Sequence, residues 1–419
     1  MNKYRQSRVK TTPYYCENKQ VMNKISFLIL SACLIGSIAQ SQNLTSGSDT
    51  KALPYTPLNN TSYDSAGNFS EGLAAVKINN KWGFVDSSGK LVIAAQFNPW
   101  QAQFNSYFSD GLVAVNLTSA KTSGNGGNDP RSTLWGFADK TGKIVIPLKF
   151  PGNYYAPPHF KDGLAIIGGS FIGTTIATFG LHTKYGYINK AGAFVIQPQF
   201  DEASDFNEDL ASVRIGDKYG FIDKTGRVVI PAIYSSPSYF NDGIAIVELN
   251  NLSFMIDKKN KKVVDKSFHG LSAFSDGLAR FEENGKVGFI DKKADIKIKP
   301  TLDFGSETSE HRMYFSEGLC PIEVGGHTDN TTHNWVAGKY GYINKDGKMV
   351  INPQFDYAGA FKNGIAVVAK YGNYGYINKT GKFIIAPIFA NAGYFIDGIA
   401  WVSGDGSFGN YKYRFLKLK

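Results

Sequence analysis

The sequence predicts an all-β protein made of tandem repeats. One module recurs at least eight times in the 419 residues, and its clearest copies occupy residues 69–97 and 361–389. Each copy holds three short runs rich in Val, Ile, Phe and Tyr, with period-two alternation and turn residues between them. We therefore predict tandem three-stranded antiparallel units, about eight in number, stacked as an elongated solenoid-like array. A closed β-propeller is the alternative, but a unit of about 34 residues is short for a four-stranded blade.

The first strand of each unit follows an aromatic residue and a polar-Gly pair. In the first copy these residues are Phe69, Glu71 and Gly72. The copies of this segment occupy residues 69–76, 108–115, 160–167, 240–247, 274–281, 315–324, 361–368 and 395–402. The carboxylate ahead of glycine recurs from unit to unit, whereas an active site would break the pattern once. We therefore assign these carboxylates to the architecture.

The second and third strands form a hairpin, seen first at residues 81–93. Asp or Asn followed three residues later by Gly, between alternating strands, is typical of a type I turn with a left-handed glycine and a bulge. The turn glycines are Gly89, Gly142, Gly192, Gly226, Gly347 and Gly381. Asn260 takes this place in the fifth copy and tolerates positive φ. Ala294 takes it in the sixth copy, so we expect that hairpin to be distorted.

The turn residues also form a periodic series of side-chain oxygens. The series is Asp86, Asp139, Asn189, Asp223, Asp257, Asp291, Asn344 and Asn378. Calcium between repeats is one interpretation, and capping of the turns is the other. Asn occurs freely in the series and no second acidic residue accompanies it at fixed spacing. These two facts favour turn capping.

An aromatic residue begins the second strand in most copies. The series is Trp82, Trp135, Tyr185, Tyr219, Tyr340 and Tyr374, with Ser253 and Val287 in two degenerate copies. Regularly spaced aromatics can stack on sugar rings, or they can fill the seam between consecutive units. Because the position accepts Val287, we favour the seam.

These features together resemble the bacterial WG (KWG) repeat family. The motif is Lys-Trp-Gly-Phe-Val/Ile-Asp, two residues, Gly-Lys, apolar-Val-Ile and Pro-x-Phe. It stands almost intact at residues 81–97, 134–150, 184–200, 218–234, 339–355 and 374–389, and eroded at 252–268 and 286–304. The resemblance implies a β-repeat protein that serves as an interaction or scaffold module. It brings no catalytic residue to any position of this chain.

Three copies are enlarged between the first and second strands, at residues 116–134, 168–184 and 325–339. Insertions at one position of a repeat emerge on one face, and that face is often where binding occurs. The first insert is polar and glycine-rich, and it offers Asp129 and Arg131 as contact residues. The second is apolar and β-branched, and it places Phe171 and Phe179 in an extra hairpin or an exposed patch.

The third insert gathers His327, Asp329, His333 and Trp335 in one loop. Two histidines and a carboxylate are able to hold zinc, and an aromatic side chain beside polar groups can hold a sugar. A loop must be rigid to fix metal geometry, and no fourth ligand is evident. We therefore predict no metal and no other cofactor, and we rank a metal-dependent hydrolase using the His327 loop as the least favoured function.

Residues 1–39 do not fit the repeat and are typical of a secretory signal. Met22 and Lys24 precede an apolar run at 25–38 that ends in small residues, with cleavage expected after Ala39. We take Met22 as the true start. The run is too short to predict a membrane span, so the mature chain is expected to have none. The alternative is a lipobox that ends at Cys33, which would carry a lipid anchor.

The rest of the chain divides into three parts. Residues 40–68 are rich in Ser, Asn, Thr and Gly and are predicted to be a flexible linker. The repeat array follows at 69–402, and residues 403–419 are predicted to be a C-terminal capping strand. Cys320 is the one cysteine beyond the signal, so packing between repeats rather than a disulfide must hold the fold. We expect this cysteine to be buried in a strand.

Charge and motifs narrow the function. The net charge is +10, but residues 1–39 hold six of the 45 Lys and Arg and one of the 35 Asp and Glu, and the remaining charges are interspersed. We therefore expect no nucleic-acid partner. No Gly-x-Ser-x-Gly or His-Glu-x-x-His motif is present beyond the signal, so we predict that the protein is not an enzyme.

The predicted function is recognition without catalysis. We expect an exported protein, periplasmic, secreted or at the cell surface, that binds a protein or a cell-envelope glycan through the face that carries the enlarged loops. The alternative is a passive structural or adhesive spacer of the cell envelope, in which the enlarged loops have no binding role.

Overall fold

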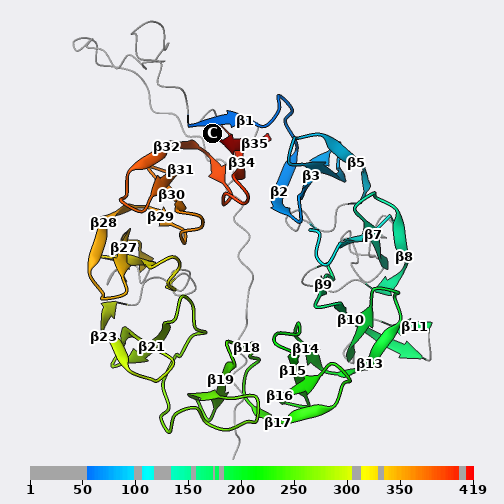
Figure 1. Ribbon diagram of the computed structural model, residues 1–419, viewed down its shortest axis with the longest axis horizontal. Helices are drawn as coiled ribbons and strands as arrows, with labels where there is room; N and C mark the ends of the chain where they lie inside the picture. Colours follow the sequence, from blue (N-terminus) through cyan, green and yellow to red (C-terminus); the bar gives the residue numbers. More distant parts are fainter. Residues whose placement is uncertain are drawn as a thin grey trace, which may run out of the picture. The chain divides into compact units, whose positions relative to one another are not determined.

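The regular structure of this protein is β-strand throughout the residues that the computed structural model describes, which are 54–98, 106–117, 134–151, 157–172, 175–178, 184–303, 313–328, 335–404 and 412–419. Within the unit Leu53–Lys419, nine small antiparallel sheets follow one another in a ring as the blades of a β-propeller (Figure 1). The predicted all-β class is confirmed. The elongated solenoid-like array is wrong, and the closed propeller named as its alternative is correct.

Each blade contains up to four strands, ordered from the ring axis outward. The innermost strands are β2 (Ser65–Ser70), β9 (Phe160–Lys161), β14 (Glu202–Ala203), β18 (Phe240–Asn241), β29 (Tyr357–Ala358) and β33 (Asn391–Ala392). The second strands are β3 (Leu73–Ile78), β6 (Leu112–Val115), β10 (Leu164–Ile172), β15 (Leu210–Ile215), β19 (Ile244–Leu249), β21 (Ala279–Glu283), β24 (Leu319–Val324), β30 (Ile365–Lys370) and β34 (Ile399–Ser403).

The other strands lie farther from the axis. The third strands are β4 (Lys81–Asp86), β7 (Leu134–Asp139), β12 (Lys184–Asn189), β16 (Lys218–Asp223), β20 (Leu252–Ile256), β22 (Lys286–Ile290), β27 (Lys339–Asn344), β31 (Asn373–Asn378) and β35 (Tyr413–Leu418). The outer strands are β5 (Leu91–Phe97), β8 (Ile144–Pro151), β13 (Phe194–Phe200), β17 (Val228–Tyr234), β23 (Ile296–Asp303), β28 (Met349–Phe355), β32 (Phe383–Phe389) and, in the last blade, β1 (Tyr55–Pro57). Three short strands lie in the inserts: β11 (Thr175–Thr178), β25 (His327–Thr328) and β26 (Trp335–Val336).

The innermost strand is what the sequence periodicity did not reveal. β9 and β18 contain two residues each. In the second blade the same position is reduced to an isolated bridge between Ser109 and Leu112. Two residues show no alternation, so these segments look like turns in the sequence. A fourth strand this short fits within a unit of about 34 residues, and the argument from length against a propeller therefore fails.

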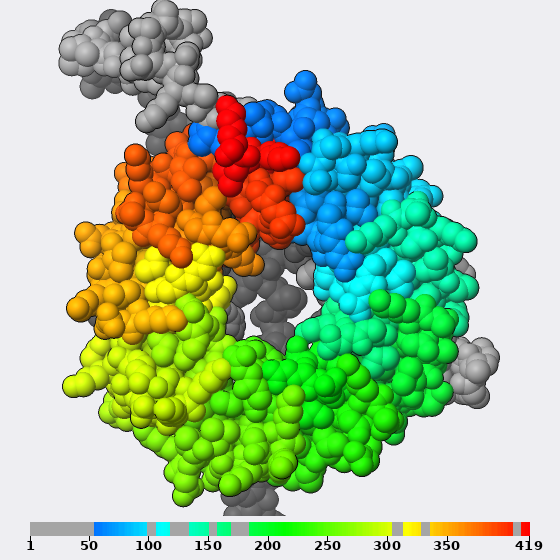
Figure 2. Space-filling view, viewed as in Figure 1, coloured from blue at the N-terminus to red at the C-terminus, as the bar shows by residue number. Residues whose placement is uncertain are grey.

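The ring closes by pairing the two ends of the described chain. β1 pairs antiparallel with β35, with Tyr55 opposite Leu418, and completes the ninth blade. Phe415 of that blade packs edge-on against Phe69 of the first, with ring centroids 5.2 Å apart. In Figure 2 the last residues, in red, lie against the first blade, in blue. Part of the segment 40–68, predicted to be a flexible linker, therefore forms strand β1 and the beginning of strand β2.

A ladder of aromatic pairs joins consecutive blades. In each pair, a ring on the third strand packs on the ring that starts the next repeat, with centroids 4.6 to 5.0 Å apart. The pairs are Phe84–Phe108, Phe137–Phe160, Tyr187–Phe206, Phe221–Phe240, Phe289–Phe315, Tyr342–Phe361 and Tyr376–Phe395. Such pairs contribute about 0.5–1.5 kcal/mol beyond the burial of their surface. In the fifth blade Met255 takes the place of the first ring and shares a buried cluster with Phe274.

The glycine of the Trp-Gly pair is required by a close approach of the outer strand. A Cβ added at Gly83 would lie 2.5 Å from the carbonyl oxygen of Ile93, and one at Gly136 would lie 2.4 Å from that of Ile146. The outer strand is bulged at this point. In the fifth blade Phe254 stands where this glycine should be. Its sheet keeps only β18, β19 and β20, with no regular outer strand.

The hairpin turns are capped by their own side chains. The Asp86 carboxylate accepts hydrogen bonds from the backbone N–H groups of Ser88, at 2.9 Å, and Lys90, at 3.1 Å. The hydroxyl of Ser88 also donates to it, and these bonds hold the pKa of Asp86 below its usual range. Gly89 has φ +82, as a left-handed turn residue requires. The expectation of a distorted sixth hairpin is wrong: Ala294 adopts φ +64 and donates to the Asp291 carbonyl at 2.9 Å, as glycine does elsewhere.

Carboxylates at the first hairpin of each unit join neighbouring blades. The Glu71 carboxylate accepts from the Gly111 N–H of the next blade at 3.0 Å, and Lys140 of that blade lies 3.2 Å from it. Glu317 repeats this with Gly364 at 2.9 Å and Lys379 at 3.0 Å. These contacts support the architectural role assigned to the recurring carboxylates. No stretch of the described chain forms a helix of the length and apolarity that a bilayer crossing requires.

Candidate functional site

The three enlarged loops emerge at one face of the ring. Each connects the second strand of a blade to the third, and this connection lies at the same end of every blade. We call this end the insert face; in the first blade it is marked by the two-residue turn Asn79-Asn80. The inserts belong to the second, third and seventh blades. The first two are therefore neighbours, and the third lies four blades farther around the ring.

The structure describes some of the predicted contact residues. Phe171 lies in β10 opposite Ile176 of β11, so the second insert continues its blade as a hairpin. Trp335 begins β26 and pairs with Thr328 of β25. His327 is exposed, and its Nδ1 lies 3.3 Å from the carbonyl oxygen of Gly325. Five candidates lie outside the described residues: Asp129, Arg131, Phe179, Asp329 and His333.

The aromatics that begin the third strands lie between blades. Trp82 is buried in a cluster with Val113 and Val115 of the next blade, and Trp135 is buried with Phe160 and Ile167 of the blade after it. Tyr340 is buried and Tyr219 and Tyr374 are half-buried in the corresponding clusters. Among the described residues no group of three or more His, Cys, Asp or Glu has the arrangement of a metal site.

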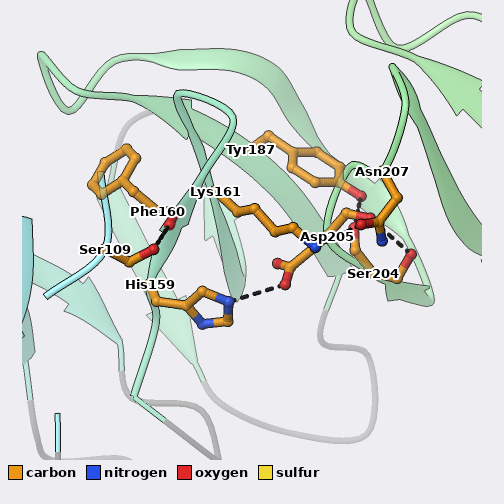
Figure 3. A network of polar contacts seen from close by, with 8 residues as sticks. All are labelled: Ser109, His159, Phe160, Lys161, Tyr187, Ser204, Asp205 and Asn207. Carbon is orange, nitrogen blue, oxygen red and sulfur yellow. Dashed lines mark hydrogen bonds and ion pairs between the residues drawn. The ribbon is translucent and has the colours of Figure 1, made fainter. Parts of the chain in front are cut away.

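Tyr107, His159 and Asp205, each of which directly precedes the aromatic residue that starts a repeat, form a polar arc that the sequence did not predict. His159 directly precedes Phe160, and the equivalent residue of the next blade is Asp205 (Figure 3). His159 Nε2 lies 2.9 Å from Asp205 Oδ2. Tyr107 is the equivalent residue of the preceding blade, and its ring centroid lies 5.6 Å from that of His159. Partial burial and the nearby Asp205 charge raise the pKa of Tyr107.

The contacts around this pair are also between blades. Lys161 donates to Asn207 Oδ1 at 2.6 Å, and the hydroxyl of Tyr187 donates to the Ser204 carbonyl at 2.8 Å (Figure 3). The side chains of His159 and Asp205 keep 32% and 25% of their surface exposed. The arc therefore ties three blades together and still offers hydrogen-bonding groups to a ligand.

The fifth blade carries a cavity of about 200 Å³ at its boundary with the sixth. Its wall includes Ser253, which takes the place of the seam aromatic, and Glu248, which lies opposite Ser253 in the β19–β20 pair. Ser236 and Tyr239 of the preceding connection and Phe274 of the sixth blade also line it. The cavity runs along β19, from Ile244 beside the first hairpin to Glu248, which is one pair from the turn at the insert face.

The sequence contained a signal for this cavity. Ser253 and Phe254 replace the aromatic-Gly pair at adjacent positions, and this loss is what makes the fifth copy of the motif eroded. Losing a large side chain from a seam leaves space that neighbouring groups fill only partly. Erosion of a repeat was thus a pointer to a concave site.

Cys320 lies in β24 within a buried cluster and forms no disulfide. Burial raises the pKa of its thiol, so the thiolate that nucleophilic chemistry needs is disfavoured.

Comparison with known proteins agrees with the repeat pattern. The solved structures to which the chain is similar include the computationally designed Ika8 protein (13% identity, 75% of this chain and 95% of that chain, TM-score 0.40). They also include a eukaryotic initiation factor (11% identity, 78% and 89% of the two chains, TM-score 0.48) and the Neurospora crassa Pan2 WD40 domain (13% identity, 61% and 86%, TM-score 0.30). No curated protein matches it. The family described as WG containing repeat matches eight times, at residues 62–82, 82–98, 135–167, 185–219, 219–252, 254–286, 340–374 and 374–406. With more than half of its residues matched, the chain belongs to the WG-containing repeat family.

Proposed function

We propose that this protein is a non-catalytic recognition propeller that binds a protein or a cell-envelope glycan through its insert face. One observation carries the proposal: all three enlargements occur at the connection between the second and third strands, so they share one face of a rigid ring. Binding residues are commonly held on loops by a rigid scaffold. One end of the fifth-blade cavity, at Glu248 and Ser253, lies one residue pair from the same face, which adds a concave element to the loops.

Export belongs to the same proposal. The apolar run at residues 25–38, with Lys24 before it and small residues up to Ala39, supports a cleaved signal. A mature chain beginning near Gln40 would place the propeller where envelope glycans and surface proteins are found.

Replacement of the loops tests the proposed function. In the variant, each of the three inserts is replaced by the Asn79-Asn80 turn of the first blade. Binding to isolated bacterial cell envelopes is measured by co-sedimentation, before and after protease treatment of the envelopes. We expect the variant to lose binding; loss of wild-type binding after protease treatment would identify a protein ligand, and its persistence would identify a glycan.

A matched control alters the opposite face. Lys90, Lys143 and Lys348 are exposed residues at the hairpin turns of that face, and their replacement by alanine should leave binding unchanged. Melting curves must show that both variants remain folded. Undiminished binding by the loop-replaced variant would refute the proposed function.

A further inference from the structure

We propose that the fifth-blade cavity binds one pyranose ring of an uncharged glycan. This inference rests on the proposed function and selects the glycan among its possible ligands. The cavity is the one place described above where the repeat loses both residues of the aromatic-Gly pair, at Ser253 and Phe254. Pattern-breaking at a concave site is what a ligand-binding role predicts.

The size of the cavity suits a single six-membered ring. Its volume is about 200 Å³. A closed apolar cavity of about 150 Å³ is enough to hold benzene. The additional volume accommodates the hydroxyl groups that a sugar ring carries on its rim. A drug-sized molecule needs roughly 300 Å³ or more, so we expect one ring rather than an extended segment to enter.

The lining of the cavity combines polar and apolar side chains. Glu248, Ser236, Ser253 and Asn241 supply the polar groups. Leu271 and Phe274 supply apolar groups, as do Ile244 and Ile246, which share one face of β19 with Glu248. A pyranose ring needs both kinds of contact, because its C–H face is apolar and its rim carries hydroxyls.

Several lining groups are already held in place. Ser236 Oγ donates to Glu248 Oε2 at 3.4 Å, and Asn241 Nδ2 donates to the Phe274 carbonyl at 3.3 Å. Backbone bonds of 2.8 and 3.0 Å between Ser253 and Phe268 fix the position of Ser253. A carboxylate has about four lone-pair sites, so Glu248 can accept from two adjacent sugar hydroxyls as well as from Ser236.

Tyr239 offers a surface for stacking. The residue lines the cavity and is 47% exposed. An exposed aromatic ring beside polar groups presents an apolar face to the C–H groups of a sugar and leaves its hydroxyl in water. The residue is equivalent in the repeat to Tyr107, His159 and Asp205, so the polar arc continues into this cavity.

Charge narrows the ligand further. Glu248 is the one charged residue that lines the cavity, which contains no Lys, Arg or His. A sugar acid or a phosphorylated sugar would place its negative charge near this carboxylate without a compensating cation. The site therefore favours an uncharged ring.

Saturation-transfer NMR on the mature protein tests the inference. The probes are the methyl glycosides of glucose, galactose and mannose, and N-acetylglucosamine, with glucuronic acid as the charged comparison. We expect transfer to the ring protons of at least one uncharged probe and none to glucuronic acid. Absence of transfer to every uncharged probe would overturn the inference.

Two variants locate the binding. Ser253→Trp restores the seam residue of other blades and should abolish transfer by filling the cavity. Glu248→Gln keeps the shape of the side chain and should weaken binding about tenfold, since a hydrogen bond to a charged acceptor is lost. The matched control is Glu282→Gln, at the equivalent position of the sixth blade, where buried Val287 occupies the seam. Transfer that is unchanged in both Ser253→Trp and Glu248→Gln would also overturn the inference.

The loop-replaced variant separates this inference from the proposed function. Sugar transfer that persists when the loops are removed supports the cavity as an independent subsite. If envelope binding survives loop replacement while Ser253→Trp abolishes sugar transfer, the proposed role of the loops fails and the subsite stands. If loop replacement abolishes envelope binding while neither Ser253→Trp nor Glu248→Gln changes saturation transfer to the sugars, the proposed function stands and the proposed subsite is wrong.

Discussion

Replacement of Phe415 by alanine tests the closure of the ring. Phe415 is 1% exposed and packs on Tyr63 and Phe69, with ring centroids 5.9 and 5.2 Å away. Truncating a buried Phe costs about 3–5 kcal/mol. Taking about 4 kcal/mol and an unfolding entropy of about 2.1 cal/mol/K per residue over the unit Leu53–Lys419, we expect the melting temperature to fall by about 5 °C.

The control for this experiment is Phe221→Ala. Phe221 is also 1% exposed, and it packs on Phe240 between the fourth and fifth blades, far from the chain ends. In a closed ring the two substitutions should destabilise the protein by similar amounts, measured by urea unfolding. In an open array Phe415 would belong to a terminal unit, which unfolds locally, so that truncation of this residue would lower the free energy of global unfolding only slightly. A cost below about 1 kcal/mol for Phe415→Ala, with a full cost for Phe221→Ala, would refute closure.

Three further results are expected. Ala294→Gly should stabilise the protein by roughly 0.5–1 kcal/mol in urea unfolding, because the relief of left-handed backbone strain at Ala294 is partly offset by the greater freedom of the unfolded chain. Gly142→Ala should destabilise the protein, because the added Cβ would lie 2.9 Å from Ile93 Cγ2. Destabilisation by Ala294→Gly would contradict the inferred strain at Ala294. Burial alone would raise the pKa of Glu317, but bonds from Lys379 and from the N–H groups of Gly364 and Asn363 outweigh it and lower the pKa. The contribution of Glu317 to stability is therefore complete above the ordinary Glu pKa and is lost as pH falls through the lower folded-state pKa. In a plot of melting temperature against pH, Glu317→Gln should reduce the fall in melting temperature on the acid side. An unchanged fall would argue against this hydrogen-bond network. Sequencing of the mature N-terminus should begin near Gln40, and a lipid-modified Cys33 would instead show lipoprotein processing.

The repeat pattern predicted the local structure better than the global one. The alternation at residues 81–93 and the Asp-x-x-Gly spacing specify a hairpin through local hydrogen bonds, and β4, Gly89 and β5 follow that expectation. Closure depends on Tyr55–Pro57 reaching Leu418, and three residues in a polar segment carry no periodic signal. Long-range pairing of this kind is decided by the partner strand, which a local pattern does not identify.

The candidate site was predicted in its general position and missed in its detail. The shared insertion point of the three loops indicated the insert face, because strand topology gives equivalent connections the same end. The pair His159–Asp205 was not foreseen, since these residues are 46 positions apart and become neighbours only through packing of adjacent blades. Charge complementarity between repeats becomes visible only when equivalent positions are compared around the ring.

The fifth blade shows how a ring of repeats can acquire a cavity while the contacts between neighbouring blades are kept. Phe254 prevents the outer strand from approaching β20, yet Ser253 keeps its backbone bonds to Phe268, so the edge of the sheet remains paired. Contact with the next blade is maintained by Met255 and Phe274, whose cluster is independent of the seam aromatic. In the fifth blade Met255, rather than the residue at 253, belongs to the cluster shared with the sixth blade, so the seam position of this blade is free to change. The seam position is therefore where we expect a propeller of this family to exchange packing for ligand binding.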